Sequence, residues 1–271
     1  MANHTRVISI LVITLAAGFP LHAAEPPKAA LEWDLRLRHE QVDDAGFGRD
    51  AAATTARLRA GLRLAPAAGW TVLLEGEGVA GAGNYNSGAN GKSAFPTVLD
   101  PTGAELNQAW VGWKGAQGGV TVGRQRVALD NQRWVGAVGW RQNEQTFDAL
   151  GAQWKPRVDL GVQYYWLDRV HRVAGDKAIN RLARERDLDS HLLNLAWKHG
   201  AQQLVGYAYL HDDRDVASAS TATYGLRWTG AAGQGGQGFG WTAEYARQTD
   251  HARNPADFGL DYWLLEPSWT Q

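Results

Sequence analysis

Arginine is the residue type whose arrangement in this chain could do chemistry. One cluster combines arginines with two aspartates: Arg124, Arg126, Arg133, Arg141, Asp130 and Asp148. A guanidinium group is a planar fork of donors that binds a carboxylate through paired hydrogen bonds. The cluster therefore predicts a constriction that grips carboxylates. The alternative is a network of salt bridges with the two aspartates that anchors a loop, and both roles could hold together.

Other kinds of chemistry find little support in the sequence. Cysteine is absent, so thiol catalysis and cysteine-ligated metals are excluded. Of the eight histidines, the six that follow residue 24 stand too far apart for a metal site. We expect no cofactor and no metal. The net charge of −1 argues against a nucleic-acid partner. No Gly-x-Ser-x-Gly motif is present, so no catalytic residue is assigned, although scattered Ser, His and acidic residues leave a hydrolase open as an alternative.

Alternation of apolar and polar residues predicts the elements that carry these side chains. In 31–38 the residues Leu31, Trp33, Leu35 and Leu37 alternate with charged ones, which is the period of a β-strand. Further candidate strands of this kind lie at 57–64, 158–167, 222–228, 239–245 and 258–264, the last with Leu260, Tyr262 and Leu264 opposite Asp261 and Trp263. Thirteen Trp and 32 Gly, beside a single Met, also favour an all-β chain.

The lengths of the connections predict how the strands are joined. Candidate turns alternate between short ones (65–69, 115–119, 155–157, 199–201) and long ones (41–52, 83–103, 128–145, 170–190), with shorter polar loops at 212–219 and 249–256 in the places of the last long ones. Short periplasmic turns and longer outer loops give this rhythm in an antiparallel transmembrane β-barrel, and the count is about twelve strands. A glycine-rich hairpin over 230–238 is longer than this rhythm predicts. The alternative fold is a soluble, secreted, glycan-binding β-sandwich, whose strands also alternate.

The first residues predict export. An apolar run from Val7 to Phe19 is followed by Pro20 and by Ala23 and Ala24, which is the pattern of a signal peptide cut after Ala23 or Ala24. The run is shorter than the ~20 residues of a spanning helix. We expect residues 1–24 to be the signal peptide and residues 25–271 to form one β-barrel domain.

A barrel in the membrane fixes which face the charges occupy. An arginine facing lipid costs roughly 2–4 kcal/mol at mid-bilayer, whereas one in a wet lumen costs little. The charged faces of the first two strands should therefore line the lumen with Arg36, Arg38, Arg57, Arg59 and Arg63, accompanied by Glu32, Asp34 and Glu40. They could form a cationic track for carboxylated sugars. The alternative is an ordinary solvated lumen whose mixed charges pair with one another.

Several motifs resemble the alginate-export family of outer-membrane porins. They are Glu105-Leu106-Asn107-Gln108-Ala109, Gly123-Arg124-Gln125-Arg126, Asp130-Asn131-Gln132-Arg133-Trp134-Val135-Gly136, Trp140-Arg141-Gln142-Asn143 and Thr146-Phe147-Asp148. The resemblance covers nearly all of residues 25–271. It implies a monomeric barrel of about eighteen strands in the outer-membrane lipid, which passes an anionic uronate polysaccharide through an arginine-lined pore.

The chain departs from this family pattern in length. It ends at Trp269-Thr270-Gln271, so we expect it to lack the C-terminal third of the family barrel and to form an unclosed wall. The resulting hypothesis is a bacterial outer-membrane porin for passive passage of anionic saccharides. The rival from another class is an outer-membrane barrel enzyme that acts on lipid or glycan.

Overall fold

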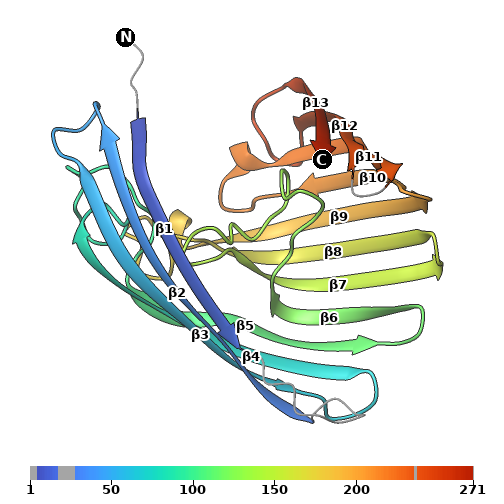
Figure 1. Cartoon of the computed structure of the whole chain (residues 1–271), viewed down its shortest axis with the longest axis horizontal. Coiled ribbons are helices and arrows are strands. Elements are labelled where there is room, and N and C mark those ends of the chain that lie inside the picture. The colour runs from blue at the N-terminus through green and yellow to red at the C-terminus, as the bar shows by residue number, and fades with distance from the viewer. Residues whose placement is uncertain (1–4, 18–27, 235–236, 271) are drawn as a thin grey trace. The chain divides into compact units, whose positions relative to one another are not determined.

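The computed structural model describes residues 5–17, 28–234 and 237–270, and nearly all of its regular structure is β-strand (Figure 1). In chain order the strands are β1 (Thr5–Ala17), β2 (Ala29–Asp44), β3 (Ala51–Leu64), β4 (Trp70–Asn84), β5 (Gly103–Lys114), β6 (Gly118–Gln125), β7 (Thr146–Arg157), β8 (Leu160–His171), β9 (Glu185–His199), β10 (Gln202–His211), β11 (Thr221–Gln234), β12 (Gln237–Asp250) and β13 (Gly259–Thr270). Two short 3-10 turns, η1 (Arg181–Ala183) and η2 (Ala217–Ala219), lie in loops. Across the described ranges, no helix is both long and apolar enough to cross a membrane.

All thirteen described strands form one antiparallel sheet in which each strand pairs with the next in the chain, from β1 to β13. Twelve of them follow residue 28, as the alternation predicts. The all-β prediction is confirmed, and a sandwich, which needs two stacked sheets, does not fit a single sheet.

The connections alternate in length as expected. Short turns span 65–69, 115–117, 158–159 and 200–201, whereas long loops span 85–102, 126–145 and 172–184. The prediction for 230–238 is wrong, because β11 continues to Gln234 and β12 starts at Gln237, with Gly230 opposite Trp241 in the ladder. The glycines there lie within paired strands.

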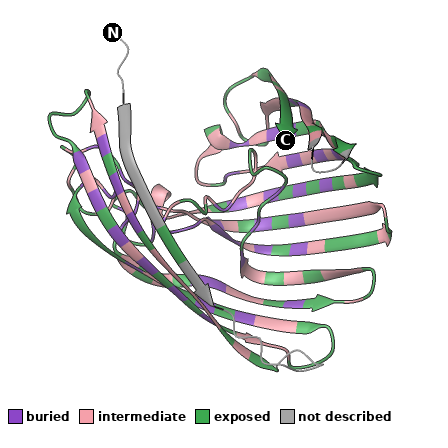
Figure 2. Cartoon of the chain, in the orientation of Figure 1, coloured by how far each residue is buried: buried purple, intermediate pink, exposed green. Residues whose placement is uncertain are grey.

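The pairing register of β2 and β3 places apolar residues on one face of the sheet and charged residues on the other, as the alternation in the sequence predicts. In the β2–β3 ladder Leu35 lies opposite Leu58, and Arg36 lies opposite Arg57. Burial alternates along β3 and, in β2, from Leu37 to Val42, as the banding in Figure 2 shows. We call the side that carries Arg36 and Arg57 the polar face of the sheet and the opposite side the apolar face.

The distribution of exposure is the reverse of that in a water-soluble protein. On the apolar face Leu58 is 50% exposed and Leu226 is 51% exposed, whereas on the polar face Arg57 is 3% exposed and Glu77 is 4% exposed. Soluble proteins rarely present a continuous apolar surface, because burying it is the main gain of folding. A lipid environment for the apolar face removes the conflict.

In the last strand, β13, the two rows of side chains lie on the opposite faces of the sheet to those predicted. Trp263 lies opposite Tyr245 and their rings are 4.3 Å apart, so Trp263 belongs to the apolar face, where it is 73% exposed. Tyr262 and Leu264 therefore lie on the polar side. Apolar residues occur on both faces of this strand, so the sequence pattern is ambiguous by one residue, and one residue exchanges the faces.

The chain divides into two compact units. Unit 1 contains Met1–Gly112, Val122–Asp148 and Val170–Arg186, and unit 2 contains Trp113–Thr121, Ala149–Arg169 and Asp187–Gln271. Thr5–Ala17 of the expected signal peptide forms β1, which pairs with β2. The expected cleavage site after Ala23 or Ala24 lies outside the described residues, so the signal peptide stays a prediction.

Candidate functional site

The loop 126–145 lies against the polar face of unit 1 and is held there through its own backbone. Arg36 donates to the carbonyl oxygens of Gly139 and Trp140, both at 2.8 Å, and to that of Arg141 at 3.1 Å. Arg38 donates to the Trp140 carbonyl at 2.9 Å. The backbone carbonyl oxygens of residues 139–141 thus accept the hydrogen bonds that the two guanidinium groups donate.

Gln142, a residue of the same loop, connects it to Thr55 on strand β3. Its side-chain Nε2 donates to Thr55 Oγ1 at 2.8 Å, and its backbone N–H donates to Asp100 Oδ1 at 3.0 Å. The Gln142 carbonyl accepts from Arg57 and Arg59, each at 3.3 Å. Gln142 is fully buried, so its position is determined by these partners rather than by solvent.

Carboxylates complete the network around Arg141. The Arg141 guanidinium lies 3.3 Å from Glu40 and 3.9 Å from Asp100, and it stacks over the Trp140 ring with 4.1 Å to the ring centroid. Arg38 also contacts Glu40 and Asp100. Burial lowers the pKa of Arg141, while the charges of Asp100 and Glu40 act in the opposite direction.

Two buried glutamates, Glu75 and Glu144, bind Arg126. Arg126 contacts Glu144 and lies 3.1 Å from Glu75, and the Asn107 side chain donates to both carboxylates at 2.6 and 2.8 Å. Glu144 also lies 3.2 Å from Arg59. The Arg126 side chain is 39% exposed, whereas those of Glu144 and Glu75 are 4% and 10% exposed. The accessible charge of this group is therefore positive.

Arg124 forms a separate group with Asp148. The Arg124 Nε donates to Asp148 Oδ1 at 2.9 Å, and His171 Nε2 lies 2.9 Å from Asp148 Oδ2. Gly123 has a φ of 119°, and a Cβ there would lie 2.3 Å from the Ala109 carbonyl oxygen. This irregularity lets Arg126 reach the polar face although it shares strand parity with Val122.

The sequence-predicted residues therefore divide into several groups. Arg36, Arg38, Arg57, Arg59, Arg126 and Arg141 converge on the loop and its carboxylates, while Arg124 and Asp148 pair beside them. Arg63 pairs with Glu32, and Arg57 also contacts Asp34. Asp130 and Arg133 lie exposed in the loop. Of the two aspartates named in the loop-anchoring alternative, Asp148 pairs with Arg124. The carboxylates that bind Arg141 and Arg126 are instead Glu40, Asp100, Glu75 and Glu144.

Some members of the network were not expected from the sequence. Glu75, Glu77, Asp100, Asn107, Gln142 and Glu144 all lie buried within it. The Glu75-Gly76-Glu77 alternation on β4 is a strand signal that would have placed both glutamates on the polar face. Asp100 and Glu144 lie in loops, where no period indicates a face.

Unit 2 has a polar face of a different kind. Tyr207 and Tyr209 stack with ring centroids 4.8 Å apart, and Tyr207 donates to Glu244 at 2.6 Å. Arg227 lies 2.6 Å from Glu244, so that pair is neutral. The Tyr207 ring lies across Gly225, where an added Cβ would be 2.2 Å from it. This wall carries hydroxyl and amide groups in place of an arginine cluster.

A serine–histidine contact bears on the enzyme alternative. Ser190 Oγ lies 2.9 Å from His211 Nδ1, and it also accepts from the Asp212 backbone N–H at 3.2 Å. Ser190 is 0% exposed, so its hydroxyl is not presented to a substrate. The contact fixes the start of the 212–220 loop instead. Among the described residues, no group of three or more metal-ligating side chains could hold a metal ion.

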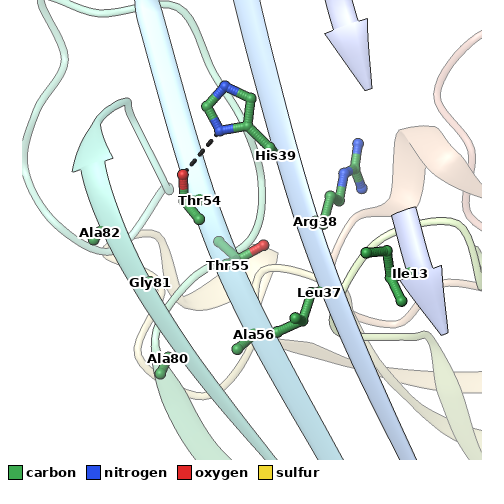
Figure 3. A pocket seen from close by; sticks show the side chains of 10 residues that line it. All are labelled: Ile13, Leu37, Arg38, His39, Thr54, Thr55, Ala56, Ala80, Gly81 and Ala82. Carbon is green, nitrogen blue, oxygen red and sulfur yellow. Dashed lines mark hydrogen bonds between the residues drawn. The ribbon is translucent and has the colours of Figure 1, made fainter. Parts of the chain in front are cut away.

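A pocket of about 440 Å³ adjoins the arginine network, because Arg38 and Thr55 are among the residues that line it (Figure 3). It is lined on the apolar face by Leu37, Ala56 and Ala80, and by Ile13 of β1. His39 and Thr54, from neighbouring strands, are joined there by a hydrogen bond of 2.8 Å. Because the pocket opens on the side that faces lipid, it is not part of the candidate site.

Solved structures with the same fold come from two bacteria, and one of them is described as an outer membrane protein. The chain is similar to OpdQ of Pseudomonas aeruginosa (TM-score 0.65, 10% identity, 91% of this chain and 64% of that one). It is also similar to the outer membrane protein OpdK of the same organism (0.61, 14%, 89% and 62%) and to OccAB2 of Acinetobacter baumannii (0.65, 14%, 88% and 62%). The chain thus spans less than two thirds of the length of these proteins. A comparison with the curated proteins found no match.

The family comparison agrees with the motifs around Arg124 and Arg141. The family model described as alginate export matches residues 30–258, which is most of the chain. With the fold and its lipid-facing apolar side, this match places the protein in the bacterial outer membrane. The chain belongs to the alginate export family, and it has the β-barrel sheet of an outer-membrane porin.

Proposed function

We propose that the protein is a porin through which anionic saccharides, such as alginate-like uronates, diffuse without covalent chemistry. The polar face is the wall of the water-filled lumen, and the loop 126–145 narrows it. Solutes meet Arg126 there, together with Arg124, Arg133 and Arg141. The expected partners are the saccharide and the surrounding outer-membrane lipid, and the pore is monomeric.

One observation carries this proposal: the accessible side of the Arg126 group is cationic. Its guanidinium is 39% exposed while the carboxylates that hold it are almost completely buried. A carboxylate sugar that passes the loop can thus accept hydrogen bonds from Arg126 without displacing Glu75 or Glu144. The buried glutamates prevent the arginine from leaving its position.

Measurement of ion selectivity tests the proposal. Arg124, Arg126, Arg133 and Arg141 are replaced singly by Ala, and reversal potentials are recorded across planar bilayers under a salt gradient. We expect each change to lower anion over cation selectivity, most strongly for Arg126. The matched control is Arg253→Ala in the loop 251–258, which should leave the reversal potential unchanged. Identical reversal potentials throughout the series would remove these residues from the site.

A second measurement separates the pore from the enzyme alternative. Oligouronates added to the wild-type pore should block its current reversibly, and a neutral oligosaccharide of equal length should block it less. Absence of conductance together with ester or glycan hydrolysis that Ser190→Ala abolishes would favour the enzyme.

A further inference from the structure

A Trp–Lys pair recurs at the short-turn ends of three strands. Trp113–Lys114 ends β5, Trp154–Lys155 lies near the end of β7, and Trp197–Lys198 near the end of β9. The tryptophans are 43%, 54% and 46% exposed and belong to the apolar face. Strand alternation therefore places the three lysines on the polar face, beside these rings.

These three lysines lie on alternate strands of the sheet, all within unit 2. With strands about 4.8 Å apart, successive lysines are spaced by roughly 10 Å. The Lys155 backbone N–H donates to the Gln117 carbonyl in the β5–β6 turn, and the Lys198 backbone N–H donates to the Asp159 carbonyl in the β7–β8 turn. The lysines thus follow one row of turns.

None of the three ammonium groups forms a hydrogen bond or ion pair within the described residues, and all three side chains are exposed. The arginines of unit 1 that line its polar face are, in contrast, bound to carboxylates or to carbonyl oxygens. The nearby carboxylate of Asp159 is already bound by Arg157 at 2.6 Å and by Trp197 Nε1 at 3.2 Å. Hydrogen bonding from Arg157 lowers the pKa of Asp159, so this pair stays ionic and neutral overall.

A pocket of about 240 Å³ adjoins two of the lysines. Its polar lining consists of Lys155 and Lys198, the Asp159 carboxylate that Arg157 already binds, and amides from β7 to β10: Gln153, Gln163, Asn194 and Gln203. Gln203 lies opposite Lys198 in the β9–β10 ladder. Asn194 and Gln153 are positioned by the hydroxyls of Tyr209 and Tyr165. Ammonium groups suit carboxylates, and primary amides both donate to and accept from sugar hydroxyls.

We propose that Lys114, Lys155, Lys198 and this amide pocket form a capture site for carboxylated saccharides at the short-turn mouth of the lumen, which faces the periplasm in barrels of this type. The inference rests on the proposed passage of such saccharides and adds where they first bind. Free positive charge at a mouth raises the local concentration of an anionic solute. The exposed tryptophans hold the three strands at the membrane interface and so keep the lysines at one depth.

Binding to the folded protein in detergent tests the site independently of transport. An oligouronate is titrated into the full chain and into a Lys114→Gln, Lys155→Gln, Lys198→Gln variant by calorimetry at low salt. Loss of the three exposed ion pairs between these lysines and the carboxylates of the saccharide should weaken its binding about tenfold. The control Lys92→Gln lies in the loop 85–102, where Lys92 is bound to the Gly83 carbonyl and Asn84, and it should bind like the wild type. A variant with arginine at the three positions should also retain binding.

Two outcomes would overturn the capture site. One is equal affinity of the wild type and the glutamine variant, and the other is no oligouronate binding by the wild type at low salt.

Addition of the oligouronate to one side of a planar bilayer at a time then tests which mouth of the pore carries the site. We expect block from the short-turn side to be slowed by the three substitutions and block from the loop side to be unaffected. The oligouronate could also bind in a way that requires the lysines and yet never block the conductance. That result would contradict the proposed function and support the capture site.

Discussion

Arg36 gives the sharpest test of how the loop 126–145 is held. We expect Arg36→Gln to open this loop without leaving a buried charge unpaired, because Arg36 binds backbone carbonyls rather than a carboxylate. Hydrogen bonds from a charged donor contribute roughly 1.5–3 kcal/mol when buried. Two of the three bonds are exposed, so we take about 1 kcal/mol for each, or about 3 kcal/mol in all. That corresponds to a roughly 100-fold larger open population.

Amide hydrogen exchange of the loop measures this population. The Gln142 N–H, bound to Asp100 Oδ1, and the Gln145 N–H, bound to the Ala137 carbonyl at 2.7 Å, are the reporters. Their exchange should accelerate by about two orders of magnitude in Arg36→Gln. The matched control is Arg63→Gln on the same polar face, because Arg63 forms its ion pair with Glu32 and not with the loop. Equal exchange in the two variants would refute the view that backbone carbonyls hold the loop.

Three further outcomes follow from particular contacts. Gly225→Ala should destabilise the protein by about 1–3 kcal/mol, because the new methyl group meets the Tyr207 ring, whereas Gly206→Ala, with 3.9 Å to its nearest neighbour, should cost less; thermal unfolding in detergent compares them. Leu226→Arg on the apolar face should cost roughly 2–4 kcal/mol if it lies near mid-bilayer, and denaturant titration in lipid vesicles measures it; no loss of stability would contradict the lipid-facing assignment. Glu144→Gln removes one of the two buried carboxylates that pair with Arg59, the other being Glu77, and should cost about 3 kcal/mol, with a visible increase in open-channel current noise; a silent variant would show that Glu144 is not part of the anchor.

Strand alternation was sufficient to predict much of the fold. Leu35 and Arg36 lie on the expected faces, because each strand separates one apolar row from one polar row. The same rule fails at Trp263, where apolar residues occupy both rows and only the cross-strand contact with Tyr245 decides the face. The glycine-rich 230–238 segment was misjudged because glycine usually indicates a turn, whereas here Trp241 covers Gly230 within the ladder.

The candidate site was only partly predictable. The arginines could be found from their types and spacing, but their partners lie far away in sequence, as with Arg141 and Glu40, which are 101 residues apart. Periodicity within one strand carries no information on which loop folds against it. The partners Asp100 and Glu144 are therefore known only from the tertiary structure. The same holds for the finding that most of these guanidinium groups already bind carboxylates or carbonyl oxygens.

The attachment of the loop through its main-chain oxygens has a consequence for protein engineering. Arg36 and Arg38 recognise carbonyl groups that every amino acid possesses, so their part of the anchor does not depend on which side chains stand at 139–141, whereas the contacts of Gln142 and Glu144 do depend on side chains. Exposed positions such as Arg133 can then be exchanged to alter what the passage admits, while the segment keeps its place. Evolution has the same freedom, since new solute preferences require no redesign of the supporting wall.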